Sequence, residues 1–204
     1  MSESKNIIFD LGGVLLDIDY QKSITAFKKL GIKNFAEMFS QFKADELFEK
    51  LETGMLSEID FYGAIKKRSK AVITDIEIEN AWNAMILNFR TESLQLLEKL
   101  SAEYKLYLLS NTNSIHFKYF QQIFTNETGK PFLDVYFSKT WYSHKVGLRK
   151  PGTAIYEFVL QDENLTAAET LFIDDSINNI EAAAAVGIKV RLLKADERIE
   201  NILL

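Results

Sequence analysis

Four groups of chemically active side chains lie where the sequence predicts a strand to end or a helix to begin. The apolar run Asn6–Phe9 stops at Asp10, and glycines follow at positions 12 and 13. A short buried strand that ends in a carboxylate and opens into glycines is the layout of a nucleophile at a sheet edge. The other three groups are Ser110 with Asn111, Lys150 immediately before a helix predicted to start at Pro151, and the pair Asp174 and Asp175.

The residue types in these groups predict a particular chemistry. Three carboxylates brought to one point would repel one another unless a hard cation lay among them. Mg²⁺ is such a cation, because it prefers carboxylate, carbonyl and water oxygens. A hydroxyl, backbone N–H groups and a lysine nearby suit the non-bridging oxygens of a phosphoryl group. The set therefore predicts a site for magnesium and a phosphoryl group, with one carboxylate left to act as nucleophile.

Each group also has an ordinary structural explanation. Paired aspartates such as Asp174 and Asp175 are common in a turn that leads into a helix. The polar run 110–113 could simply cap the helix that follows it. A lysine before a proline, such as Lys150, is commonly a solvated surface charge. The order of the four groups along the chain favours the chemical interpretation.

The elements that must position these groups alternate between strands and helices. Between the strands, apolar residues recur every three or four positions, which is the spacing of helices. One predicted helix covers residues 177–186 and is closed by Gly187. A capping box from Thr166 to Glu169 predicts the start of a helical turn. The pattern predicts an α/β fold with a doubly wound, mostly parallel, Rossmann-like sheet, whose carboxyl edge binds ligands. The predicted strands, with the continuous apolar character of strands covered on both faces, are Lys5–Asp10, Lys105–Ser110, Asp134–Ser138, Thr170–Asp174 and Ile188–Leu193.

A long helical stretch interrupts this alternation. From about Gln21 to Asn88 the pattern predicts helices and no strand, with capping signals at 57–60 and 74–77. The stretch is interpreted as an insertion over the sheet edge, and a bundle that merely precedes the sheet is the alternative. Asp10 lies before the stretch and strands resume after it, which favours the insertion. We therefore expect a core of residues 1–16 and 89–204 and an all-helical cap of residues 17–88.

The length and composition suit one domain, or one domain with a modest insertion. The chain has 204 residues, of which 47% are apolar, enough for a full core. Lys and Arg number 24 against 29 Asp and Glu, with no basic run, which argues against nucleic acid or membrane as a partner. Cysteine is absent, and no stretch approaches the roughly 18 apolar residues of a membrane span or resembles a secretory signal, so a cytoplasmic location is expected. The oligomeric state stays unknown.

These motifs, in this order, resemble those of the haloacid dehalogenase-like (HAD) hydrolase superfamily over nearly the whole chain. The position of the helical stretch is similar to the C1-type cap of that superfamily. Within it, the details are similar to a bacterial sugar-phosphate phosphatase subgroup that includes α-D-glucose-1-phosphate phosphatase. The segments that carry the resemblance are 7–15, 17–19, 109–113, 147–151, 155–156, 172–176 and 179–183.

The resemblance implies a Mg²⁺-dependent phosphomonoester hydrolase that acts on a small phosphorylated metabolite, such as a sugar phosphate. Asp10 would attack phosphorus and form an aspartyl-phosphate, which water then hydrolyses. Mg²⁺ would be held by Asp10, the backbone carbonyl of Gly12, and Asp174 or Asp175. The phosphoryl oxygens would be bound by Ser110, the Asn111 backbone and Lys150.

Gly12 departs from the pattern of the superfamily. Most of its phosphatases carry at this position a second aspartate that protonates the leaving group and later activates water. Such catalysis is worth about 10²–10⁴-fold in rate. A water, a good leaving group such as an anomeric sugar phosphate, or one of the linker residues Asp17 and Asp19 must compensate. Two alternatives stay open: a 2-haloacid dehalogenase, which needs no metal, and a catalytically weak phosphate-binding or interaction protein.

Overall fold

A five-stranded parallel sheet forms the centre of the computed structural model, which describes residues 4–40 and 43–202. The strand order is β7-β6-β1-β8-β9, and every neighbouring pair is parallel. This order confirms the predicted α/β fold with a doubly wound sheet and places β1 between β6 and β8. The strands are β1 (Asn6–Phe9), β6 (Lys105–Ser110), β7 (Lys139–Tyr142), β8 (Thr170–Asp174) and β9 (Lys189–Leu192).

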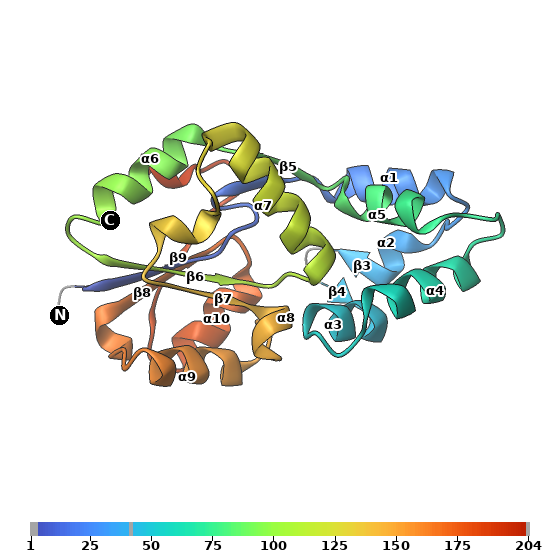
Figure 1. The fold of residues 1–204 in the computed structure, drawn as a ribbon. Coiled ribbons are helices and arrows are strands. Elements are labelled where there is room, and N and C mark those ends of the chain that lie inside the picture. Colours follow the sequence, from blue (N-terminus) through green and yellow to red (C-terminus); the bar gives the residue numbers. More distant parts are fainter. Residues whose placement is uncertain (1–3, 41–42, 203–204) are drawn as a thin grey trace.

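Helices cover both faces of this sheet because its central strand is apolar on both sides. Ile7 and Phe9 belong to the same buried cluster as residues of α6 (Thr91–Leu100) and α7 (Ser114–Thr128). Ile8, whose side chain points to the opposite face, packs in a second cluster with α9 (Thr153–Asp162) and α10 (Ile177–Ala185). Figure 1 shows α6 and α7 on one side of the sheet and α9 and α10 on the other. The short helix α8 (Ser143–Val146) follows β7, and the 3₁₀ turn η3 (Ile199–Asn201) packs against α6.

A ribbon of two antiparallel strands, β2 (Leu16–Ile18) and β5 (Ile86–Phe89), carries the chain away from the sheet and back. The prediction of helices alone from Gln21 to Asn88 is therefore wrong at β5. It is also wrong at the paired two-residue strands β3 (Phe39–Ser40) and β4 (Lys43–Ala44). Strands of two to four residues are too short to show the alternation by which a strand is recognised.

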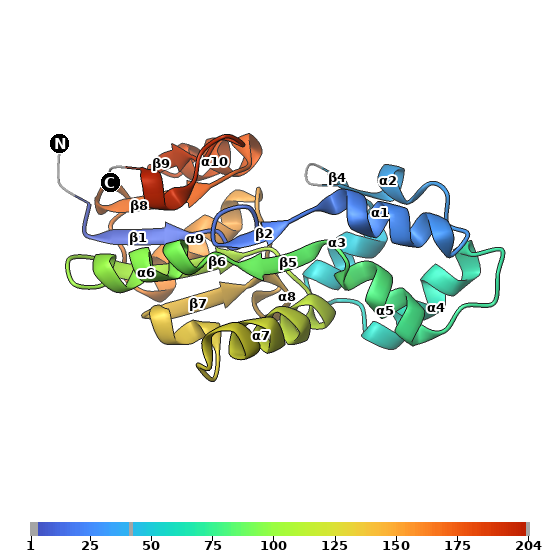
Figure 2. The ribbon, with the colours of Figure 1, turned by 90° about the horizontal axis from the view of Figure 1, so that it is seen from above.

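Among the residues that the structure describes between β2 and β5, five helices form one helical segment. The indole of Trp82 packs at its centre, with ring centroids 5.1 Å from Phe48 and 6.0 Å from Phe35. Figure 2 shows this segment beyond the end of the sheet where β1 and β7 finish. The division into a core of 1–16 and 89–204 and a cap of 17–88 stays a prediction. The helices are α1 (Tyr20–Lys29), α2 (Phe35–Met38), α3 (Glu46–Glu52), α4 (Glu58–Arg68) and α5 (Asp75–Asn83).

Several predicted helix ends are confirmed. The side chain of Ser57 accepts the Asp60 N–H at the start of α4, and Thr74 forms a complete capping box with Glu77 at the start of α5. Gly187 follows α10 with φ +85°, a conformation that glycine adopts without strain.

Three local predictions are wrong. Residues 134–138 are not a strand: they lie largely in a 3₁₀ turn, η1 (Leu133–Tyr136), and the strand begins only at Lys139. The Asp134 carboxylate there accepts hydrogen bonds from Thr140 Oγ1 and Tyr142 OH at 2.8 and 2.7 Å, so it braces β7 instead of extending it.

The second and third errors concern helix starts. The expected capping box from Thr166 to Glu169 is a 3₁₀ turn, η2 (Ala167–Glu169), without a side-chain cap, because β8 begins directly after it. Helix α9 begins at Thr153 and not at Pro151.

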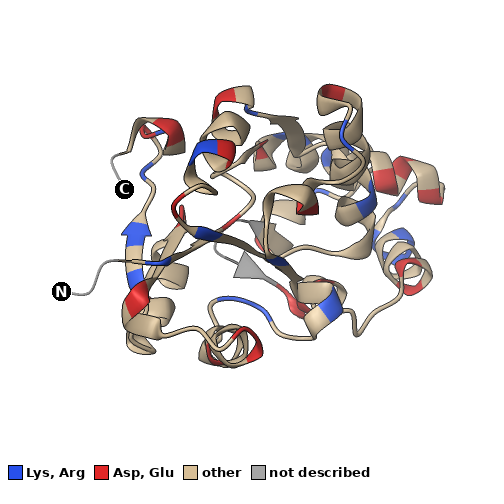
Figure 3. Cartoon of the chain, turned by 60° about the vertical axis from the view of Figure 1, so that its left-hand side comes forward, with Lys and Arg blue, Asp and Glu red and all other residues tan. Residues whose placement is uncertain are grey.

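The charge distribution agrees with the absence of a basic run in the sequence. Acidic and basic residues are interspersed along the helices and the sheet edge (Figure 3). Within the part of the chain that the structure describes, no helix is long and apolar enough to cross a membrane.

Candidate active site

Three carboxylates meet at the carboxyl end of the central strands. Asp10 directly follows β1, and Asp174 is the last residue of the neighbouring strand β8. These two side chains and that of Asp175 each offer an oxygen within 4.8 Å of the other two. Asp10 and Asp174 are buried, and Asp175 is half-buried. The structure therefore brings together the three acids singled out from the sequence, while their role as metal ligands stays a prediction.

Lys150 lies between two of these acids and is almost completely buried, with 1% of its side chain exposed. Its Nζ donates to Asp10 Oδ1 at 2.8 Å and to Asp174 Oδ2 at 2.7 Å. The side chain of Asn111 holds the Lys150 backbone from both sides, accepting its N–H at 2.9 Å and donating to its carbonyl at 2.8 Å. The explanation of Lys150 as a surface charge is therefore wrong.

Asp174 is held by several donors at once. Its Oδ1 accepts the Ser176 N–H at 2.8 Å, which is the turn contact expected of an aspartate before a helix. Asn179 Nδ2 lies 3.0 Å from both carboxylate oxygens, and Lys150 completes the set. A fully buried carboxylate needs such donors to stay charged. Asp174 thus makes the structural turn and also contacts the ammonium group.

One ammonium group does not balance these acids. Burial raises the pKa of Asp10 to about 7; Lys150 opposes this rise, and the charges of Asp174 and Asp175 add to it. Burial also raises the pKa of Asp175 to about 6, again with a contribution from Asp174. Burial disfavours the charged form of Lys150, yet its attraction to Asp10 and Asp174 raises its pKa. A set of carboxylate oxygens short of positive charge fits a hard divalent cation such as Mg²⁺.

The end of β6 contributes the hydroxyl and amide groups. Ser110 is buried, and it lines the same cavity as Asn111 and Asp10. The helix-cap explanation of this polar run holds for Asn113, whose Oδ1 accepts the N–H groups of Ile115 and His116 at 3.1 and 3.0 Å. The roles of Ser110 and Asn111 in phosphoryl binding stay predictions.

The loop after Asp10 is held by Arg90, which the sequence analysis did not single out. Arg90 is buried directly after β5, and its Nη2 donates to the carbonyl of Gly13 at 3.0 Å and to that of Val14. Its Nε lies 3.4 Å from Asp17 Oδ1. The only signal in the sequence was a lone arginine after a short apolar run, and its partners lie more than 70 residues earlier in the chain.

Gly13→Ala is expected to weaken magnesium binding. Gly13 has φ +76°, and a Cβ there would overlap the Asp175 carboxylate. The matched control is Gly129→Ala, because Gly129 has φ +71° and a Cβ there would meet nothing within 4 Å. Both variants should lose about 1–2 kcal/mol in urea unfolding because of the left-handed backbone. Only Gly13→Ala should lose magnesium affinity, by roughly tenfold in calorimetric titration. Equal affinities in the two variants would contradict a metal role for Asp175.

Gly12 lies where a general acid was expected from the family pattern. It lines the cavity with Asp10, and a Cβ on it would lie 3.1 Å from Ile18 Cγ1. Ile18 of β2 therefore occupies the space beside this position, and a larger residue there would have to displace it. The metal contact expected from the Gly12 carbonyl stays a prediction.

The two linker acids considered as replacements lie outside the cavity lining. Asp17 Oδ1 pairs with Arg198 Nη1 at 3.0 Å as well as with Arg90. Asp19 is the N-cap of α1 and accepts the Gln21 N–H at 2.9 Å. Their contacts favour the structural explanation of both residues over a role in proton transfer.

A cavity of about 400 Å³ extends from these acids to the helical segment. Its floor includes Asp10, Lys150 and Asp175, and its far side combines apolar and charged residues. A cavity of this size holds a phosphoryl group and a small organic group attached to it. Its apolar lining includes Leu16, Ile18, Tyr20, Phe39 and Met85.

Comparison with known proteins identifies the family. The model of the haloacid dehalogenase-like hydrolases matches residues 5–187. The chain belongs to this family. The predicted membership of the HAD superfamily is thus confirmed, and the chain is a HAD hydrolase.

Two relatives of this HAD hydrolase carry phosphatase names. The chain is 32% identical over 185 residues to D-ribitol-5-phosphate phosphatase of Bacteroides thetaiotaomicron, which covers 91% of this chain and 89% of the relative. It is 28% identical over 189 residues to a sesquiterpene phosphatase of Aspergillus oryzae, covering 90% and 87% of the two chains.

A solved structure resembles this HAD hydrolase over nearly its whole length. It is a HAD-family enzyme of Bacteroides thetaiotaomicron in complex with magnesium and inorganic phosphate. The two chains are 36% identical, with a TM-score of 0.86 and coverage of 96% of this chain and 97% of the other.

Proposed function

We propose that this HAD hydrolase is a Mg²⁺-dependent phosphomonoester hydrolase acting on a small metabolite, with sugar and polyol phosphates as the favoured class. The observation that carries the proposal is the position of Lys150 among three carboxylates that lie within 4.8 Å of one another. One ammonium group and one divalent cation together balance three carboxylates. The phosphatase names of two relatives and the magnesium and phosphate bound by a similar structure support the same chemistry.

Asp10 is the nucleophile of this reaction. A carboxylate oxygen attacks phosphorus, so a P–O bond to Asp10 forms while the bond to the leaving oxygen breaks and its electron pair departs with that oxygen. Water then attacks the aspartyl-phosphate, releases inorganic phosphate and restores the carboxylate. Lys150, 2.8 Å from Asp10 Oδ1, keeps the nucleophile oriented and offsets the charge of the incoming phosphate.

The remaining groups hold the metal and the phosphoryl oxygens. Asp10, the Gly12 carbonyl and Asp174 or Asp175 would hold Mg²⁺, which would offset the phosphoryl charge so that a carboxylate can approach phosphorus. The phosphoryl oxygens accept hydrogen bonds from the Ser110 hydroxyl, the Asn111 N–H and the Lys150 ammonium group.

Gly12 limits the kinds of leaving group that react quickly. Without an acid at this position, the departing oxygen must leave as a comparatively stable anion or take its proton from water. An anomeric sugar phosphate meets the first condition. This requirement supports a sugar phosphate among the substrates.

Residues 17–88 act as a cap in this proposal, over a core of 1–16 and 89–204. Tyr20 and Phe39 of this segment line the cavity that also contains Asp10. The leaving group therefore lies against the cap while the phosphoryl group lies on the core.

The alternative of a 2-haloacid dehalogenase is less favoured. That chemistry uses the nucleophilic aspartate without a metal, so the cluster of Asp10, Asp174 and Asp175 would keep an unbalanced charge. A catalytically weak phosphate-binding protein would use the same site, and only its slow turnover would distinguish it from the proposed phosphatase.

Phosphate release from a panel of sugar and polyol phosphates tests the function. Excess EDTA should lower the rate by at least roughly 100-fold, because without Mg²⁺ the negative carboxylates repel the phosphate group. Added Mg²⁺ should restore it, and EDTA already saturated with Mg²⁺ is the control. Chloride release from 2-chloropropionate in EDTA would favour the dehalogenase. Failure to hydrolyse any phosphate would favour the binding protein.

A further inference from the structure

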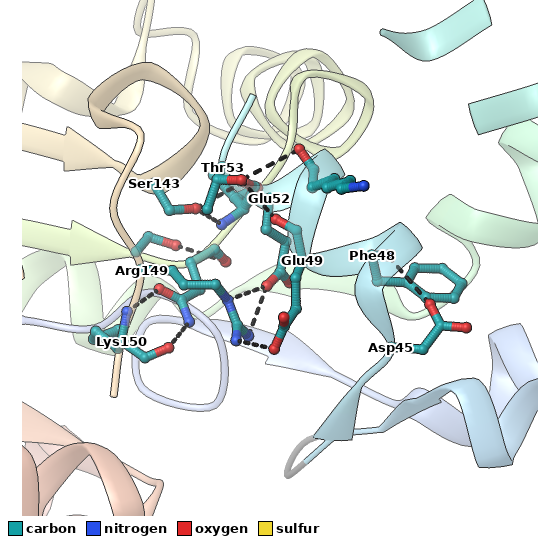
Figure 4. A network of polar contacts seen from close by, with 12 residues as sticks. Asp45, Phe48, Glu49, Glu52, Thr53, Ser143, Arg149 and Lys150 are labelled. Atoms are coloured by element: carbon teal, nitrogen blue, oxygen red, sulfur yellow. Dashed lines mark hydrogen bonds and ion pairs between the residues drawn. The ribbon is translucent and has the colours of Figure 1, made fainter. Parts of the chain in front are cut away.

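A network of three charged side chains lines the cavity on the side of the helical segment. Arg149, the residue before Lys150, lies with Nε 2.9 Å and Nη2 2.8 Å from Glu52 Oε2, and with Nη1 3.3 Å from Glu49 Oε1. Figure 4 shows the guanidinium group of Arg149 pointing toward both glutamates of α3. The three residues line the same cavity as Asp10. We call Glu49, Glu52 and Arg149 the acidic wall.

Arg149 is not available as an anchor for an anion. Each of its three guanidinium nitrogens already lies against a carboxylate of the wall. The Glu52 side chain is only 8% exposed, and burial raises its pKa while Arg149 opposes the rise. A carboxylate that accepts two guanidinium N–H groups is best satisfied in its charged form. A further anion would have to break this pair and leave a buried charge behind.

The charge around the cavity is strongly one-sided. Among the described residues, the acidic wall and the site together place five carboxylates against two cationic side chains, Lys150 and Arg149. One Mg²⁺ leaves this set still negative, and a phosphate group adds further negative charge. A second acidic group on the substrate would therefore enter a region without any uncompensated positive charge. The five carboxylates are Asp10, Asp174, Asp175, Glu49 and Glu52.

We propose that the acidic wall selects substrates whose leaving group is neutral and hydroxylated, and rejects those that carry a second acidic group. The inference rests on the proposed phosphomonoesterase function and deepens it. Carboxylate oxygens of Glu49 and Glu52 accept hydrogen bonds from substrate hydroxyls. They repel a substrate carboxylate or second phosphate at the same place.

Pairs of substrates that differ in one group test this selection. Each pair joins a polyol phosphate with the aldonate phosphate in which the terminal CH₂OH is replaced by a carboxylate, in chains of three, four and five carbons. The ratio of kcat/KM within the pair that reacts fastest measures the selection. Wild type should favour the polyol by roughly 100-fold, since like charges at close range cost several kcal/mol.

Glutamine variants show whether the acidic wall causes this ratio. Glu49→Gln and Glu52→Gln keep the side-chain shape and should each lower the ratio about tenfold, mainly by raising kcat/KM for the aldonate. Because the ratio compares two substrates on one variant, a partly unfolded preparation does not alter it. The control is Glu46→Gln, which removes the same charge from the same helix, where Glu46 is 80% exposed and pairs with Lys50. Its ratio should stay that of wild type.

Calorimetry separates this proposal from the proposed function. The Asp10→Asn protein with Mg²⁺ should bind the polyol member of each pair more tightly than the aldonate member, even if no phosphate ester is hydrolysed by wild type. An aldonate that reacts or binds as well as its polyol would overturn the selection. So would ratios that stay unchanged in both wall variants, or a change of equal size in Glu46→Gln.

Discussion

Asp10→Asn is expected to reduce Mg²⁺-dependent phosphate release by about 10⁴-fold or more, because the amide cannot form the covalent bond to phosphorus. The measurement is inorganic phosphate released under single-turnover and steady-state conditions. The control is Asp196→Asn, an exposed aspartate in the loop after β9. Full activity of Asp10→Asn would exclude the aspartyl-phosphate route.

The dependence of its thermal stability on pH provides a separate test that Asp10→Asn is folded. The pKa of Asp10 is raised from 3.8 to about 7 in the folded protein, so the folded state holds a proton that the unfolded state releases between these values. Stability of the metal-free wild type therefore falls as pH rises through this window. Asparagine removes this dependence. In EDTA, the variant should melt above wild type at pH 8, and the difference should shrink at pH 5.

Lys150→Met is expected to harm both stability and catalysis. The ammonium group is the contact shared by Asp10 and Asp174, and methionine fills the space without the charge. Loss of one partner from a buried ion pair costs about 3–5 kcal/mol. Phosphate release should fall by roughly 10³-fold, because the phosphate then lacks one of its two cations. Urea unfolding and steady-state kinetics measure the two effects.

Magnesium distinguishes the two contributions of Lys150. Saturating Mg²⁺ should recover much of the lost stability of Lys150→Met, because it neutralises the same carboxylates, but it should recover little activity. Lys99→Met, on the exposed face of α6, is the control for removal of a lysine charge. If Lys150→Met were as stable as wild type in EDTA, the charge balance described for the site would be contradicted.

The sequence predicted the parts of the fold that depend on continuous apolar runs. Strands ending near Asp10, Ser110 and Asp174 were found because both faces of each strand are buried, which leaves an unmistakable composition. Parallel pairing then places the strand ends at one edge, so the proximity of the acids followed from topology. Capping signals at Ser57 and Thr74 were equally local, and the structure has both.

Predictions failed where a contact joins segments far apart in sequence. Arg90 could not be connected with the Gly13 carbonyl, because that contact exists only after β2 and β5 pair. The side chain of Asn111 holds the Lys150 backbone, 39 residues away, and no pattern in the sequence indicated this contact. A shorter-range contact accounts for the error at residues 134–138: Asp134 lies in a 3₁₀ turn, and its carboxylate accepts a hydrogen bond from Tyr142 OH, eight residues later. None of these contacts has a periodic or compositional signal.

The pairing of β2 with β5 bears on how this enzyme can diversify. Leu16 lies opposite Phe89, so the polypeptide departs from the sheet and returns to it at adjacent points. The segment between β2 and β5 can therefore lengthen, shorten or change its sequence without displacing strands β1 and β6 of the sheet. Homologous enzymes can thus change their substrate preference through this segment while the phosphoryl-transfer site on the sheet stays the same.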